Sequence, residues 1–139
     1  MEATLEAPDI RLPSVSNAAR RGGWALTALP VLFMGFDAVI KFAHIPAVAE
    51  AAARLGWPDH LNSALGVVIV ICLALYLWPR TAVLGATLFT GYLGGAVAIH
   101  ARIGDPLLTH ILFPVYVGGL LWAGLAMREA GVRALLFPK

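Results

Sequence analysis

Long apolar runs separated by short polar breaks dominate the amino-acid sequence. Four runs are long enough to cross a bilayer, because about twenty helical residues span a hydrocarbon core of roughly 30 Å; they lie at residues 24–42, 61–78, 81–99 and 107–127. Pro79 follows the second run, and Asp105 and Pro106 precede the fourth, where Asp105 is expected to cap the helix. The pattern predicts four membrane-spanning helices.

A shorter segment between the first two runs has a different pattern. It reads HIPAVAEAAARLGWP, with Val48 and Leu55 on one helical face and Glu50 and Arg54 as an i, i+4 pair on the other. This segment is too short to span a membrane. We expect a short amphipathic helix at the membrane interface, with Trp57 as an aromatic anchor.

The composition indicates a membrane protein rather than a soluble enzyme. The chain has 139 residues, of which 60% are hydrophobic and 13% are charged, whereas soluble domains are about half apolar and about a quarter charged. A domain of this size buries only about two-thirds of its surface, so the excess apolar surface must face lipid. We therefore predict an all-α fold: an integral membrane four-helix bundle, with residues 22–139 as one domain after a polar tail at residues 1–21.

Charge and cysteine content exclude several other classes. The net charge is +2 and the ten Lys and Arg residues are scattered, so the sequence offers no basic patch for nucleic acid. The single cysteine, Cys72, excludes an internal disulfide and a thiolate metal cage. Because no HxxxH or HxxE pair falls on one helix, no metal site is expected.

The distribution of cations predicts how the helices are oriented. Four spans place both termini on one side of the membrane, together with the turn between the second and third runs. Seven cations belong to that side, Arg11, Arg20, Arg21, Arg80, Arg128, Arg133 and Lys139, against three on the other, Lys41, Arg54 and Arg102. The positive-inside rule therefore places both termini in the cytoplasm.

Glycines in the third run predict where helices meet. Apolar helices associate in lipid through close backbone approach, which small residues permit. Gly91, Gly94 and Gly95 are therefore expected to form a close contact with a neighbouring helix, and a closer one than any at Gly124.

Polar residues in the apolar runs gather at the outer end of the predicted bundle. Asp37 and Lys41 share one stripe of the first helix, His100 and Arg102 end the third, and His110 lies in the first turns of the fourth. A charged group at the bilayer centre costs roughly 2.5–3.5 kcal/mol, so such groups face the bundle or a wet cavity. We predict that these residues line a small-molecule pocket. Two alternatives remain: purely structural bonds between helices, and a Lys41 side chain that extends to the headgroups.

Three stretches of the sequence resemble a known family. LWPRTAVLGATLFTGYLGGAVAIHARIGDP, at residues 77–106, is similar to the signature of the DoxX-like family of small bacterial four-helix membrane proteins. HILFPVYVGGLLWAGLAMR, at residues 110–128, resembles the last helix of that family, and GFDAVIKFAHIPAVAEAAARLGWP, at residues 35–58, resembles its first helix and loop. The resemblance extends over residues 22–138 and implies a four-helix fold, a place in the bacterial inner membrane and a lipid-like ligand such as a quinone.

Two functions remain open at this point. In the first, a quinone or another lipid-soluble molecule binds in the outer polar pocket, histidine exchanges the accompanying protons, and a partner redox system supplies electrons. In the second, the protein is an accessory subunit that packs against a larger membrane protein complex and has no chemistry of its own. The sequence has no flavin or haem motif, and the inner half of the bundle lacks the polar path that a transporter needs. No reaction is assigned.

Overall fold

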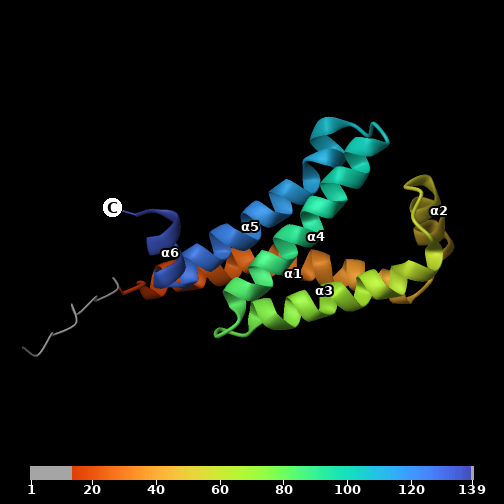
Figure 1. Cartoon of the computed structure of the whole chain (residues 1–139). Helices are drawn as coiled ribbons and strands as arrows, with labels where there is room; N and C mark the ends of the chain where they lie inside the picture. Colours follow the sequence, from red (N-terminus) through yellow and green to blue (C-terminus); the bar gives the residue numbers. More distant parts are fainter. Residues whose placement is uncertain (1–13, 139) are drawn as a thin grey trace, which may run out of the picture.

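The computed structural model describes residues 14–138, and these residues form a bundle of helices (Figure 1). Its long helices are α1 (Asn17–Phe42), α3 (Asn62–Leu77), α4 (Ala82–Arg102) and α5 (Phe113–Arg128). Shorter elements connect or follow them: α2 (Pro46–Arg54), the 3₁₀ turn η1 (Asp59–Leu61), the π-helical turn η2 (Leu107–Ile111) and α6 (Ala130–Leu136). The predicted all-α four-helix fold, with a short helix between the first two spans, is confirmed.

The four long helices converge at one end and diverge toward the other (Figure 1). α1 packs mainly against α3 and α5, and α4 packs mainly against the same two helices, so α1 and α4 face each other diagonally. α6 lies where the helices converge, which we call the closed end, and α2 lies where they diverge, which we call the open end (Figure 1).

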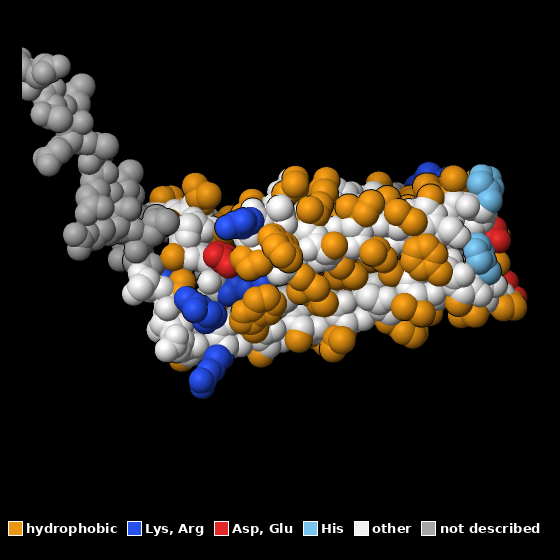
Figure 2. All heavy atoms as spheres, turned by 90° about the horizontal axis from the view of Figure 1, so that it is seen from below, with side chains coloured by type: hydrophobic (Ala, Val, Ile, Leu, Met, Phe, Trp, Pro, Cys, Tyr) orange, Lys and Arg blue, Asp and Glu red, His pale blue; other side chains and the backbone are white. Residues whose placement is uncertain are grey.

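The outer surface of the bundle is apolar. Within the described residues, four helical segments are long and apolar enough to cross a membrane, with η1 and η2 extending two of them. Large side chains such as Leu32, Phe36 and Leu108 are exposed on this surface. Figure 2 shows a broad hydrophobic band, with most of the visible Lys and Arg toward one end and the His side chains at the other. The chain is a multi-pass membrane protein.

Local sequence explains where several helices begin and end. The Ser16 hydroxyl accepts the N–H three residues further on at 3.2 Å and so caps α1. Pro46 opens α2, where its missing N–H is not needed. Gly56 and Gly104 follow α2 and α4 with φ of +68° and +72°, the left-handed conformation that favours glycine. α1 thus starts inside the predicted polar tail, of which residues 1–13 lie outside the described part of the chain.

Glycines make the closest helix contacts, and these lie at the closed end. A Cβ added to Gly85 would lie 2.3 Å from the backbone nitrogen of Tyr76, so α4 and α3 touch backbone to backbone. A Cβ added to Gly124 would lie 2.5 Å from Thr27 Oγ1, where α5 meets α1. Side chains therefore cannot be introduced at these two positions without moving a helix.

The prediction of a close contact at Gly91, Gly94 and Gly95 was wrong. A Cβ added to any of the three would meet nothing within 4 Å. The reason is that α4 moves away from α3 toward the open end while it stays beside α5 (Figure 1). Gly94 in addition lies on the exposed surface of the helix.

Buried polar bonds add to the packing of the closed end. The Tyr76 hydroxyl donates to the carbonyl oxygen of Leu121 at 2.7 Å. The buried Arg128 guanidinium lies 4.3 Å and 4.8 Å from the ring centroids of Trp24 and Tyr76, and its Nη2 donates to the Tyr76 carbonyl oxygen at 2.9 Å. These contacts offset the cost of burying a cation. These contacts pack the interior of the closed end, where a pocket of only about 260 Å³ lies between α1 and the end of α3.

Candidate site in the open half of the bundle

A cavity of about 830 Å³ lies between the diverging helices. Residues of α1, α2, α3, α4 and α5 line it, and most of them are apolar, for example Phe33, Ile40, Leu65, Ile99 and Phe113. Ligand pockets typically have volumes of roughly 300–1,000 Å³, with apolar walls and a few polar groups. The cavity therefore has the size and composition of a binding site for an apolar molecule.

Two of the glycines just described form part of the cavity wall. Gly91 and Gly95 line the cavity, whereas Gly94 is absent from its lining. The open space in front of Gly91 and Gly95 is thus the space of the cavity. Without side chains, these positions leave room for a ligand rather than for another helix.

The amphipathic helix α2 covers one side of the cavity. Val48, Ala52 and Leu55 of its apolar face contribute to the lining. Trp57, in the loop after α2, also lines the cavity, and its buried indole nitrogen has no hydrogen-bond partner among the described residues. Trp57 was expected only as an interfacial anchor, and no feature of the sequence pattern indicated its place in the cavity lining.

An ion pair forms the polar part of the wall contributed by α1. Lys41 Nζ lies 3.1 Å from Asp37 Oδ1, and the two side chains are only 16% and 23% exposed. Tyr92 of α4 reaches across the bundle, and its hydroxyl donates to Asp37 Oδ2 at 3.4 Å. The carboxylate therefore has partners from two helices, and the two opposite charges cancel.

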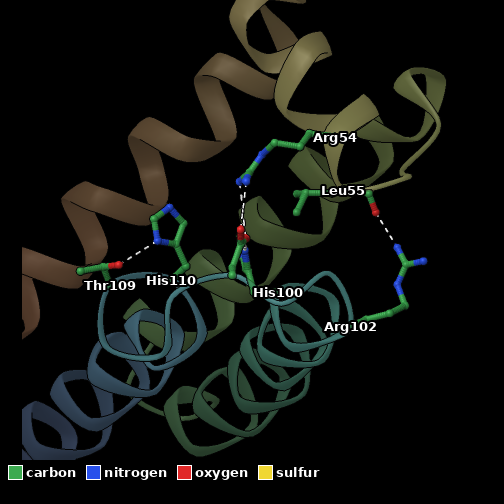
Figure 3. A network of polar contacts seen from close by, with 7 residues as sticks. Arg54, Leu55, His100, Arg102, Thr109 and His110 are labelled. Atoms are coloured by element: carbon green, nitrogen blue, oxygen red, sulfur yellow. Dashed lines mark hydrogen bonds and ion pairs between the residues drawn. The ribbon is translucent and has the colours of Figure 1, made fainter.

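A second polar group lies where the end of α4 approaches α2 (Figure 3). His100, which lines the cavity, places Nδ1 2.5 Å from Asp105 Oδ2. Arg54 of α2 donates to both oxygens of the same carboxylate, at 2.9 Å and 3.4 Å. Asp105 is almost fully buried, so these two partners replace the water that it has lost.

The expectations for Asp105 and Arg54 were both wrong. Asp105 does not cap the following turn, because η2 begins after Pro106 without a side-chain cap. Arg54 bonds to Asp105 instead of Glu50. The contact joins residues that are 51 positions apart, and helical spacing along a single segment cannot reveal such a pair.

Strong acid is expected to detach α2 from the turn between α4 and η2. The hydrogen bond from His100 holds the pKa of Asp105 below its ordinary value, and Arg54 adds to this, outweighing the opposite effect of burial. A carboxyl group whose pKa is lowered by folding stabilises the fold above its unfolded pKa, near 3.9, and loses this contribution as the pH falls through the lower folded value. The ion pair between Arg54 and Asp105 should thus persist at neutral pH and weaken below about pH 4.

Pulsed electron–electron double resonance, which measures the distance between two spin labels, would test this prediction with labels at Glu50 of α2 and Leu108 of η2. The distance should lengthen or its distribution should broaden at about pH 3. Asp105→Asn, which has no carboxyl group to titrate, is the control and should show much less change with pH. A wild-type distance that stays constant down to that pH would contradict the prediction.

The other two predicted site residues lie near the cavity but do not line it. Arg102 donates from Nη2 to the carbonyl oxygen of Leu55 at 2.6 Å and so holds the end of α2 (Figure 3). The exposed His110 places its ring centroid 5.8 Å from that of His100, and its Nδ1 lies 2.9 Å from Thr109 Oγ1. The structure therefore brings three of the five predicted residues to the cavity.

Tyr92 is one of the polar cavity residues that the sequence analysis did not predict, together with Trp57 and the buried Asn62. Tyr92 lies within GYLGG, whose glycines were predicted to form a helix contact. A hydroxyl-bearing side chain in the middle of a membrane span was the available signal, because such a group needs a partner in lipid. Among the described residues, no group of three or more His, Cys, Asp or Glu side chains is placed to hold a metal ion.

The fold and the cavity define a small multi-pass helical membrane protein with a largely apolar internal site. A family model described as the DoxX-like family matches residues 25–124. The chain belongs to the DoxX-like family, as the three stretches of its sequence predicted. No curated protein and no solved structure matched the chain.

Proposed function

We propose that this protein binds a lipid-soluble molecule with a compact polar head, such as a quinone, in the cavity of its open half. The observation that carries the proposal is a large apolar cavity whose wall holds the Asp37–Lys41 pair and the Tyr92 hydroxyl. An apolar tail would lie along the aromatic and aliphatic lining, and the head would lie at the polar groups.

The chemistry of the wall favours an uncharged head group. Asp37 and Lys41 neutralise one another, so a ligand charge would have no counter-ion there. An ammonium group has three donors, and Lys41 uses one of them on Asp37, which leaves donors for a ligand oxygen. Trp57 supplies a further buried N–H that has no hydrogen-bond partner within residues 14–138. Carbonyl or hydroxyl oxygens on a neutral ring match these donors, and a partner redox system would exchange electrons with such a ligand.

Loss of the Asp37 carboxylate is expected to release the ligand while the bundle stays folded. Asp37→Asn removes the charge that holds Lys41 and replaces one of the two acceptor oxygens with an NH₂ donor, so Lys41 and Tyr92 can no longer each bond to an oxygen of their own. After gentle transfer into nanodiscs, extraction and mass spectrometry should find a lipid-soluble molecule with the wild type and at least tenfold less with the variant, the loss that about 1.4 kcal/mol of binding energy would give.

A matched control tests whether ligand loss requires that the removed carboxylate lie at the cavity. Glu50 is a carboxylate on the exposed face of α2 and does not line the cavity, so Glu50→Gln should retain the wild-type amount of ligand. Equal retention by Asp37→Asn and the wild type, with both proteins folded, would refute the proposal. Recovery of a larger protein subunit in fixed proportion, with no small molecule, would instead favour the accessory-subunit function.

We further propose that the protein lies in the bacterial inner membrane with its closed end toward the cytoplasm. Arg20, Arg21, Arg80 and Arg133 belong to α1, the α3–α4 turn and α6, all at the closed end, and the positive-inside rule favours the cytoplasm for that end. Arg11 and Lys139, which were also counted toward it, lie outside the described residues. The cavity then opens in the outer half of the membrane.

Cysteine labelling on a Cys72→Ser background tests this orientation. A cysteine at Arg80 should resist an impermeant maleimide in spheroplasts, and one at Glu50 should react, because the two positions lie at opposite ends of the bundle. Both should react after the membrane is permeabilised. Labelling at Arg80 without labelling at Glu50 would invert the orientation.

A further inference from the structure

The His100–Asp105 pair at the cavity has a defined arrangement of hydrogens. Arg54 donates twice to Asp105, an interaction that requires the ionised carboxylate. An ionised carboxylate only accepts hydrogen bonds, so the short contact with His100 places the hydrogen on Nδ1. In the neutral ring Nε2 then carries the lone pair. No other hydrogen bond of this ring is found among the described residues, which leaves Nε2 available on a residue that lines the cavity.

We propose that His100 is the proton acceptor of the cavity, that Asp105 and Arg54 position it for this role, and that the ligand it recognises carries an O–H group, as a hydroquinone does. This inference rests on the proposed function and adds to it the hydrogen-bonding character of the ligand. An Nε2 lone pair accepts a hydrogen bond from a hydroxyl but repels the lone pairs of a carbonyl oxygen. The site thus distinguishes the reduced form of such a ligand from the oxidised form.

Proton transfer at this site is a simple acid–base step. The ligand O–H bond breaks heterolytically, its electron pair stays on the ligand oxygen, and the proton forms a bond to Nε2. The imidazole becomes an imidazolium whose Nδ1–H remains bonded to Asp105, so the new positive charge lies beside an existing negative one. No oxidant or reductant takes part in this step.

The charges around His100 come from several elements. Asp105, on the turn after α4, and Arg54, on α2, form the cluster itself. His110, on η2, packs edge-on against the ring, and the Asp37–Lys41 pair, on α1, lines the same cavity. The nearest partner of the imidazole is thus an anion, and Arg54 is bound to both oxygens of that anion.

Asp105→Asn is expected to reverse the hydrogen pattern of the ring. Arg54 can only donate, so it would hold the amide oxygen of the new side chain and turn the NH₂ group toward His100. Nδ1 would then accept, and Nε2 would carry the hydrogen and be available as a donor on this cavity-lining residue. The variant should therefore prefer the carbonyl form of the ligand, whereas the wild type should prefer the hydroxyl form.

The test compares decylubiquinol with decylubiquinone, each titrated anaerobically into the protein in nanodiscs and followed by tryptophan fluorescence. At about pH 8 the wild type should bind the quinol about fivefold more tightly than the quinone, the ratio expected for one net hydrogen bond of about 1 kcal/mol. Asp105→Asn should reverse the preference and bind the quinone more tightly under the same conditions.

Arg54→Gln distinguishes the positioning of His100 by Asp105 from the ion pair that links α2 to the turn. This variant breaks the link between α2 and the turn but leaves the carboxylate beside His100. The ratio of the quinol affinity to the quinone affinity should therefore stay above one even if both affinities fall. The ¹⁵N shifts of labelled histidine, assigned with His100→Gln, give an independent readout: Nε2 should resonate as an unprotonated nitrogen in the wild type and as a protonated one in Asp105→Asn.

The outcomes distinguish this inference from the proposed function. Binding of both probes with equal affinity in the wild type, or the same ratio in the wild type and Asp105→Asn, would overturn the role of His100 while leaving the binding function intact. Failure of the wild type to bind either probe would overturn both. A protonated Nε2 in the neutral wild-type ring would overturn the inference whatever the binding data.

Discussion

Gly85→Ala is expected to lower the free energy of unfolding by about 3 kcal/mol, the upper range for overpacking a well-packed core. The added Cβ would lie 2.3 Å from the backbone nitrogen and 2.5 Å from the Cα of Tyr76. Backbone atoms cannot turn aside as a flexible side chain can, so α3 and α4 must separate. That separation would also disturb the hydrogen bond from the Tyr76 hydroxyl to Leu121.

Gly94→Ala provides the matched control on the same helix. Its Cβ would meet nothing within 4 Å, and alanine favours a helix over glycine by about 0.8–1 kcal/mol. Unfolding in mixed micelles, followed by circular dichroism during titration with denaturing detergent, should show a lower midpoint for Gly85→Ala and an unchanged or higher one for Gly94→Ala. Equal midpoints for the two variants would refute the close contact between α3 and α4.

The sequence was sufficient to predict the helices, because the length and polarity of a segment decide whether it crosses a membrane. The predicted run at residues 81–99 corresponds to α4 (Ala82–Arg102), and the break at Gly104 coincides with a left-handed turn. The angle between the helices could not be predicted from the sequence. Gly85 and Gly95 look alike in sequence, yet one touches a backbone and the other borders a cavity. Their difference depends on how far α4 has diverged from α3 at each level.

The candidate site was predictable where it depends on one helix and unpredictable where it depends on several. Asp37 and Lys41 are four residues apart on α1, and their pairing follows from helical spacing. Tyr92, the partner of Asp37, lies 55 positions away from it in the sequence. Arg54, the partner of Asp105, lies 51 positions away. These contacts exist because α4 crosses the bundle and α2 folds back over it. Both are tertiary features that no single segment encodes.

Gly95→Leu is expected to abolish ligand binding without weakening the fold. Gly95 lines the cavity and has no atom within 4 Å of its Cβ position, so a leucine side chain would occupy space that the proposed ligand needs. Leucine is also a better helix former than glycine. The stability of the bundle should therefore stay the same or rise, while the amount of co-purifying lipid-soluble ligand should fall at least tenfold, a change of about 1.4 kcal/mol in binding free energy.

Gly94→Leu introduces the same side chain one position earlier on α4, outside the lining of the cavity. It should leave ligand content at the wild-type level, because its leucine would extend from the exposed surface of the helix rather than into the site. Mass spectrometry of ligand extracted from the two variants and the wild type, normalised to folded protein, makes the comparison. Ligand loss in both variants would mean that the bound molecule lies on the outer surface of α4. Loss in Gly95→Leu alone would locate it within the cavity, beside the Asp37–Lys41 pair and His100 that line the same space.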